Sequence, residues 1–146
     1  MKSTKEPFVI PTRMSYLFLA TLLCCITACT TTGAPQPALP IQDAGMLDSA
    51  PYRIDIPENW NGDLVVLLHG YEPKGPPRQQ PWPQNEAAPL FLAKGYAVAA
   101  SGYSSQGWAV ADAVSDTERL RAYFIGKYRK PRHAYLVGFS MGGLAA

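Results

Sequence analysis

A serine between two glycines is the first candidate for chemistry in this sequence. Residues 138–142 read Gly-Phe-Ser-Met-Gly and fit the pattern G-x-S-x-G, with Ser140 at the centre. The pattern requires a sharp, strained turn between a strand and a helix, which exposes the serine hydroxyl as a nucleophile. Such a serine attacks an acyl carbonyl and forms an acyl-enzyme. The alternative reading is an ordinary turn serine.

The elements that must position Ser140 follow from the hydrophobic pattern. Continuous apolar runs predict strands that are covered on both faces of a parallel sheet, at residues 64–68, 96–100 and 134–138. The last run leads directly into Ser140. The first ends in His69-Gly70-Tyr71, where an oxyanion-hole loop should follow its strand.

Helices are predicted between these strands. Residues 87–94 can form a short helix that ends at Gly95, and the proline-rich residues 73–83 form a loop. A longer helix is indicated by an apolar stripe at helical spacing: Val110, Ala113, Val114, Thr117, Leu120 and Phe124. We expect the polar residues off this stripe to be solvated: Asp112, Asp116, Arg119 and Lys127. With an alternating strand at residues 52–56 and a turn at 57–62, the order predicts an α/β sheet.

Taken together, these segments resemble the α/β-hydrolase superfamily, in particular its secreted esterase and peptidase-like branches. The similar stretches are WNGDLVVLLHGY, GYAVAASGYSSQGWAV and YLVGFSMGG, within residues 52–146. The resemblance implies a mostly parallel sheet flanked by helices, in strand order 1-2-4-3-5-6-7-8. The chain would supply the N-terminal portion of that fold, incomplete after the nucleophile turn.

The resemblance also assigns roles. Ser140 would be the nucleophile, and the backbone N–H groups of Met141 and Tyr71 would stabilise the oxyanion, with His69 and Gly70 supporting the oxyanion loop. Tyr103, Ser105 and Trp108 follow the second apolar strand. They line a substrate pocket or pack beneath their loop, and the sequence leaves this choice open.

A serine also needs a base, and in this family an acid and then a histidine follow the serine along the chain. After Ser140 only residues 141–146 remain, and they contain neither. His133 precedes the strand that ends at Ser140, so it belongs to the wrong sheet edge, and His69 is expected in the oxyanion loop. The preceding helix offers no convincing acid among Asp112, Asp116 and Glu118. We therefore interpret the chain as C-terminally truncated and expect it to be inactive alone.

The first 50 residues carry different signals. A basic start and an apolar stretch at residues 16–27 predict a secretory signal in residues 1–28. Ile26-Thr27-Ala28-Cys29 resembles a bacterial lipobox, which implies lipidation of Cys29 and, with Thr30 next, outer-membrane anchoring on the periplasmic side. The alternative is ordinary cleavage after Ala28 and secretion. Residues 29–50, rich in Thr, Pro and Ala, are predicted as a tether to a domain at 51–146.

Composition limits the partners. All three cysteines lie in the leader, so the remaining chain has no thiol for a disulfide or a metal. The leader also accounts for the net charge of +2. The basic residues at 127–132 suit a helix C-terminus better than a nucleic-acid patch. No cofactor or metal is implied.

Two hypotheses follow. In the first, the chain derives from a lipid-anchored serine hydrolase that acts on carboxylic esters or, as a peptidase, on peptides. In the second, it is a non-enzymatic or degenerate envelope lipoprotein.

Overall fold

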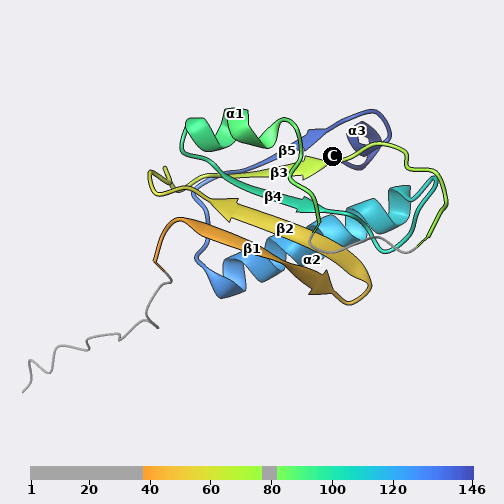
Figure 1. Cartoon of the computed structure of the whole chain (residues 1–146), viewed down its shortest axis with the longest axis horizontal. Helices are drawn as coiled ribbons and strands as arrows, with labels where there is room; N and C mark the ends of the chain where they lie inside the picture. The colour runs from red at the N-terminus through yellow and green to blue at the C-terminus, as the bar shows by residue number, and fades with distance from the viewer. Residues whose placement is uncertain (1–37, 77–81) are drawn as a thin grey trace, which may run out of the picture. The chain divides into compact units, whose positions relative to one another are not determined.

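The computed structural model describes residues 38–76 and 82–146, which form a mixed five-stranded sheet with helices against both faces (Figure 1). The strands are β1 (Ile41–Leu47), β2 (Ala50–Ile56), β3 (Leu64–Leu68), β4 (Ala97–Ser101) and β5 (Ala134–Gly138). The helices are α1 (Ala88–Ala93), α2 (Val110–Lys127) and α3 (Gly142–Ala145). The structure is of the α/β class, and the predicted strands and helices of residues 52–138 are present.

The sheet has the order β1-β2-β4-β3-β5. β3 pairs in parallel with both β4 and β5, whereas β2 pairs antiparallel with β1 and with β4. The predicted parallel arrangement is therefore confirmed for the three apolar strands. The sheet as a whole is mixed, because β2, the strand of the β1–β2 hairpin that pairs with β4, runs in the opposite direction to β4.

β3 lies between the two hydrophobic layers that cover the faces of the sheet, which explains its continuous apolar sequence. Successive side chains of a strand point to opposite faces. Leu64, Val66 and Leu68 accordingly pack with α2 on one face, while Val65 and Leu67 pack with α1 on the other. All five residues are buried, as predicted for a strand covered on both sides.

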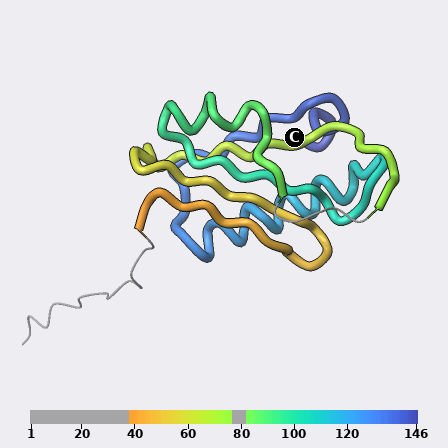
Figure 2. The backbone as a smooth tube through the Cα atoms, in the orientation of Figure 1, coloured from red at the N-terminus to blue at the C-terminus, as the bar shows by residue number. Residues whose placement is uncertain are grey.

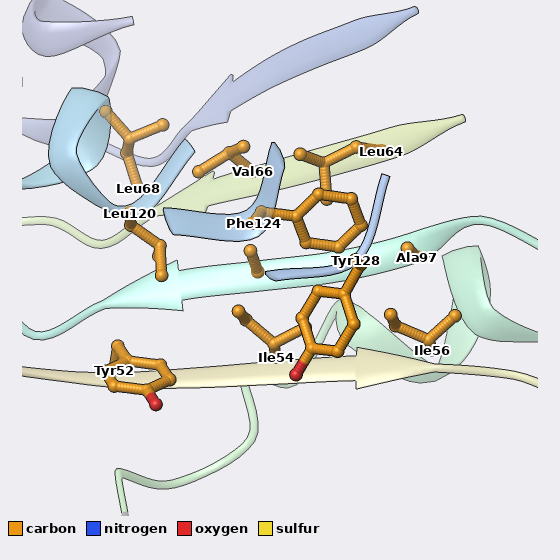
Figure 3. Packing of buried hydrophobic residues seen from close by; sticks show 11 residues of the cluster. Tyr52, Ile54, Ile56, Leu64, Val66, Leu68, Ala97, Leu120, Phe124 and Tyr128 are labelled. Carbon is orange, nitrogen blue, oxygen red and sulfur yellow. The ribbon is translucent and has the colours of Figure 1, made fainter. Parts of the chain in front are cut away.

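α2 covers one face of the sheet through Leu120, Phe124 and the following Tyr128 (Figure 3). The predicted stripe is mostly confirmed, but Val114 is half exposed. The prediction that Asp116 is solvated is wrong: only 3% of it is exposed. Hydrophobic periodicity missed this residue because its carboxylate is buried by polar contacts rather than by apolar packing.

The basic residues around the end of α2 make contacts within the domain. Lys127 forms an ion pair with Asp43 of β1, and Arg132 lies 3.3 Å from Asp63. The guanidinium of Arg129 lies over the Trp60 ring, 4.3 Å from its centroid. These contacts support the structural interpretation of the cluster.

β1 corrects the predicted tether. Residues 29–50 were expected to lack regular structure, but Ile41–Leu47 pairs along its whole length with β2. The sequence signal was weak, because the face of β1 that turns toward α2 carries Asp43 and Gly45 between Ile41 and Leu47. Residues 29–37, the predicted signal peptide and Cys29 lie outside the described residues.

β5 forms the other edge of the described sheet, and Figure 2 shows β1 and β5 on opposite sides of the backbone trace. Its sequence, AYLVG, contains no charge, and its first three residues are exposed. The strand runs directly into the turn that holds Ser140. Across the described residues, no helix is both long and apolar enough to span a membrane.

Candidate active site

Ser140 lies in a strained turn between β5 and α3. Its φ is +51°, in the left-handed region that a residue with a side chain rarely occupies. The serine is exposed, while Met141 and Gly142 on its C-terminal side are buried. Strain of this kind persists only where the surrounding structure enforces it. The turn therefore has the geometry that the sequence pattern predicts for an exposed nucleophile.

The two glycines of the pattern, Gly138 and Gly142, make room for this turn. A Cβ added at Gly138 would lie 2.3 Å from the carbonyl oxygen of Gly142. A Cβ added at Gly142 would lie 2.3 Å from the carbonyl oxygen of Leu68, at the end of β3. Both obstacles are backbone atoms, which cannot move aside as a flexible side chain would. The turn can be this tight only because neither position carries a side chain.

The predicted oxyanion loop lies against the serine. A Cβ added at Gly70 would be 3.1 Å from the Cβ of Ser140 and 3.7 Å from its hydroxyl oxygen. The N–H of Phe139 also donates to the carbonyl of Leu68, at 3.0 Å, which ties the serine turn to β3. The backbone that leads from Gly70 to Tyr71 thus borders the Ser140 side chain, and Met141 follows the serine directly.

His69 is built into the framework of this loop. Its ring stacks on the buried Tyr103, with 4.0 Å between centroids, and its Nδ1 lies 2.8 Å from the Gly70 carbonyl, which makes Nδ1 the donor. The Tyr103 hydroxyl donates to the His69 carbonyl at 3.0 Å. A histidine held on both its ring and its backbone supports a loop, and this arrangement agrees with the role expected of His69.

His133 lies at the opposite end of β5. It precedes the strand, whereas Ser140 follows it, and five residues of strand span roughly 16 Å. Its carbonyl accepts a hydrogen bond from Leu64 N–H at the start of β3, and its Nδ1 lies 3.2 Å from an Asp63 oxygen. Neither histidine of the sequence is therefore positioned as a base for Ser140.

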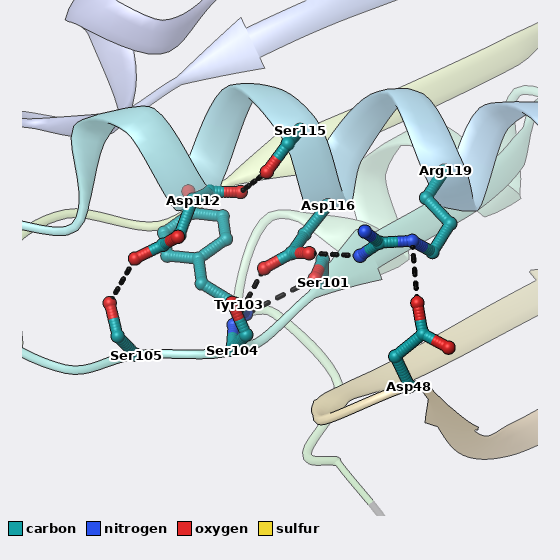
Figure 4. Close-up of polar contacts among 9 residues, drawn as sticks. All are labelled: Asp48, Ser101, Tyr103, Ser104, Ser105, Asp112, Ser115, Asp116 and Arg119. Carbon is teal, nitrogen blue, oxygen red and sulfur yellow. Dashed lines mark hydrogen bonds and ion pairs between the residues drawn. The ribbon is translucent and has the colours of Figure 1, made fainter.

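Two acids of α2, Asp112 and Asp116, are engaged by the loop after β4 and by Arg119, as Figure 4 shows. Asp116 accepts a hydrogen bond from the Ser104 N–H at 2.6 Å and forms an ion pair with Arg119. Asp112 accepts from the Ser105 hydroxyl. Both carboxylates therefore fasten the loop after β4 to the first half of α2, and they position the wall of the site without contacting Ser140.

Glu118 is likewise paired, with Arg121 on the exposed surface of α2, and hydrogen bonding from that guanidinium lowers the pKa of the carboxyl below its usual value. The described part of the chain holds no cluster of three or more His, Cys, Asp or Glu side chains suited to a metal ion.

The structure distinguishes the roles of the three residues that the sequence could assign either to a pocket or to packing beneath the loop. Tyr103 is fully buried, with a φ of +59°, and packs against His69, so it belongs to the scaffold. Trp108 is 72% exposed and, with Ser105, lines a surface cavity of about 830 Å³ that also includes Tyr71. A second cavity, of about 500 Å³, is lined by residues that include His69, Trp82 and Phe139.

Comparison with known proteins identifies no family for this chain. No protein-family model matches this chain, and a search of curated proteins finds no match either.

Proposed function

We propose that Ser140 is the nucleophile of a serine hydrolase of the α/β-hydrolase type, acting on carboxylic esters. The observation that carries this proposal is the strained, exposed Ser140 at the end of a parallel strand, with its side chain against Gly70. The strand order β1-β2-β4-β3-β5 also agrees with the order that the resemblance implies.

The proposed reaction uses the residues around the turn. The Ser140 oxygen attacks the ester carbonyl carbon while a base takes its proton, and the carbonyl oxygen becomes an oxyanion. The N–H groups of Tyr71 and Met141 are the proposed donors to that oxyanion. Collapse of the intermediate expels the alcohol, which takes up a proton, and leaves the acyl group on Ser140. Water then releases the acid and restores the serine.

The reaction also needs a base and an acid that orients it, and the residues near Ser140 do not supply them. His69 supports the loop and His133 lies at the far end of β5. The proposal therefore assigns the nucleophile and the oxyanion donors to named residues and assigns the proton acceptor to none of the residues described around Ser140. On its own the chain should react slowly.

Chemical rescue tests this assignment. The full chain is incubated with a fluorophosphonate, with and without imidazole as a soluble base, and the modified residue is identified by mass spectrometry. We expect imidazole to accelerate modification of Ser140, because a soluble base can accept the proton of a correctly exposed hydroxyl. Ser140→Ala should abolish this labelling.

Ser115→Ala is the matched control, since Ser115 is an exposed serine on α2 outside the turn. Its loss should leave the imidazole-dependent labelling unchanged. Equal labelling of the wild type and Ser140→Ala would overturn the proposal. A folded chain whose Ser140 stays unmodified at every imidazole concentration would favour the non-enzymatic alternative.

We also propose that the protein is anchored to the cell envelope through a lipid on Cys29. This rests on the sequence Ile26-Thr27-Ala28-Cys29 alone. Metabolic labelling with a fatty acid in a bacterial host tests it: the label should be present in the wild type and absent from Cys29→Ser. Label retained in that variant would refute the anchor.

A further inference from the structure

Two loops meet at the carboxyl end of the sheet, beside the proposed oxyanion loop. One follows β3 and contains Tyr71 and Lys74; the other follows β4 and contains residues 102–108. Gly107 N–H donates to the Glu72 carbonyl at 2.8 Å, which forms an isolated β-bridge between the loops. The cavity between them is thus framed by backbone pairing.

Gln106 adds a second connection between the loops. Its side-chain oxygen accepts from Gly75 N–H at 2.7 Å, and its side-chain nitrogen donates to the Pro76 carbonyl at 3.2 Å. Ser105, the other polar residue of this wall, donates its hydroxyl to Asp112. The polar side chains of the β4 loop are therefore used to hold the cavity in shape.

Aromatic rings supply the exposed walls. Tyr71 and Trp108 are 53% and 72% exposed, and their ring centroids lie 6.0 Å apart at an interplanar angle of 54°. Large exposed aromatic surfaces that border a cavity are a common mark of a binding site. The volume of about 830 Å³ lies within the range of small-molecule pockets.

Charge narrows the class of ligand. Lys74 lines the same cavity, and its side chain ends in a cationic ammonium group. Sugar sites need hydrogen-bonding groups aimed at several hydroxyls, whereas Ser105 and Gln106 are already engaged with the protein. Two aromatic faces and one cation fit a planar aromatic ring that carries a negative charge.

We propose that this cavity binds an aromatic carboxylate or the anionic aromatic part of a larger ester. In combination with the function proposed above, on which this second step rests, the cavity would direct Ser140 toward aromatic esters. Tyr71 connects the two sites, because its ring is a wall of the cavity and its backbone N–H is the proposed oxyanion donor.

Binding of 2-naphthoate to the full chain tests the cavity, with affinity measured by ligand-observed nuclear magnetic resonance. Trp108→Ala should weaken binding by about two- to tenfold, the value of one aromatic contact. Lys74→Gln should weaken the binding of 2-naphthoate by about two- to fivefold and leave the binding of the neutral 2-naphthalenemethanol unchanged. The saturated decalin-2-carboxylate should bind more weakly than 2-naphthoate.

Leu90→Ala is the control, because Leu90 is an apolar residue of α1 that is 69% exposed and lies outside this cavity. Trp108 is itself so exposed that its replacement should leave the melting curve unchanged, which is checked for every variant. Equal affinity of Trp108→Ala and wild type, or equal binding of the saturated acid, would overturn the proposal.

The same titration on Ser140→Ala separates this inference from the proposed reaction. Retained binding in that variant is expected whether or not Ser140 reacts with a fluorophosphonate. A failure of labelling with intact, Trp108-dependent binding would therefore remove the hydrolase and leave the aromatic site. Intact labelling without such binding would remove only the aromatic site.

Discussion

β1 and β5 both form an edge of the sheet, but the contacts that hold them differ in kind. β1 is tied to α2 by Asp43, whose carboxylate accepts hydrogen bonds from Tyr52, Lys127 and Tyr128 at 3.1, 2.9 and 2.7 Å. β5 carries no charged residue, and its Tyr135 and Leu136 are 45% and 43% exposed. One edge is fixed by a polar cluster, while the other offers apolar surface.

The difference matters because exposed, uncharged edge strands can pair with other chains. At β1, the half-buried Asp43 puts a charge on the inward face and joins the strand to a helix that packs on the core. At β5, the described residues provide no comparable charge. The proposed nucleophile is attached to this less protected edge, so the behaviour of β5 and of the turn should be linked.

The largest expected effect comes from filling the turn after β5. Gly138→Ala places a Cβ against the backbone of Gly142, so we expect a loss of about 3 kcal/mol in the free energy of unfolding. Gly126→Ala is the control, because a Cβ there meets no atom within 4 Å. Gly126 lies in the last turn of α2, where the preference of a helix for alanine over glycine is weaker than in its middle, so this variant should gain less than about 1 kcal/mol. Urea unfolding measures both changes, and equal effects would contradict the tight turn.

Asp43→Ala removes the polar cluster that holds the edge strand β1. It removes the acceptor shared by Lys127, Tyr52 and Tyr128, so we expect a loss of about 2 kcal/mol, typical of hydrogen bonds to a charged group. Gln42→Ala is the control, because Gln42 is the exposed neighbour on the same strand and should change stability by less than about 0.5 kcal/mol. A loss at Gln42 as large as at Asp43 would show that β1 needs its backbone pairing more than the polar cluster.

Acid should weaken the same edge, by less than the alanine variant does. Burial tends to raise the pKa of Asp43, but hydrogen bonds from Lys127 and Tyr128 outweigh it and hold the pKa below its usual value. The carboxylate thus stabilises the fold above about pH 4, and this contribution disappears as the pH falls through the lowered pKa. Unfolding free energies measured from pH 6 to pH 2 should fall more steeply for wild type than for Asp43→Asn. Parallel curves would contradict this role.

The contrast between the edges also explains what the sequence predicted well. β5 and its turn were predicted because a continuous apolar run and a pair of glycines at fixed spacing are local signals. β1 was missed because Asp43 and Gly45 interrupt the apolar pattern of its inward face, and because the Lys127 ammonium and Tyr128 hydroxyl that bind Asp43 come from a distant part of the chain. No local pattern in residues 41–47 contains that information.

The candidate site shows the same contrast between features that local sequence signals predict and features that depend on distant contacts. The positions of Ser140 and Gly70 follow from strand order and glycine spacing, so they were predicted together. The burial of Asp116 depends on the N–H of Ser104, in a loop that packs back on α2. The one local hint was Arg119, three residues later on the same helix, whose guanidinium pairs with Asp116. Likewise, the exposure of Trp108 depends on how two loops meet, which periodicity does not describe.

The smallest effect on stability, and the most direct test of the β5 edge, is expected from Leu136→Lys. The residue is 43% exposed, so a lysine stem can keep the apolar contacts while its ammonium reaches water, and stability should change by less than about 0.5 kcal/mol. A charge on the edge should nevertheless oppose strand pairing between copies. Light scattering at rising concentration should therefore show aggregation of the wild type well before Leu136→Lys.

Leu90→Lys adds the same charge at an exposed apolar residue of α1, away from the edge, and separates the effect of position from that of net charge. If edge pairing drives association, Leu90→Lys should aggregate at nearly the same concentration as the wild type. Equal protection by both lysines would attribute association to net charge instead. Protection by Leu136→Lys alone would mean that the strand leading to Ser140 is also the surface through which the chain self-associates.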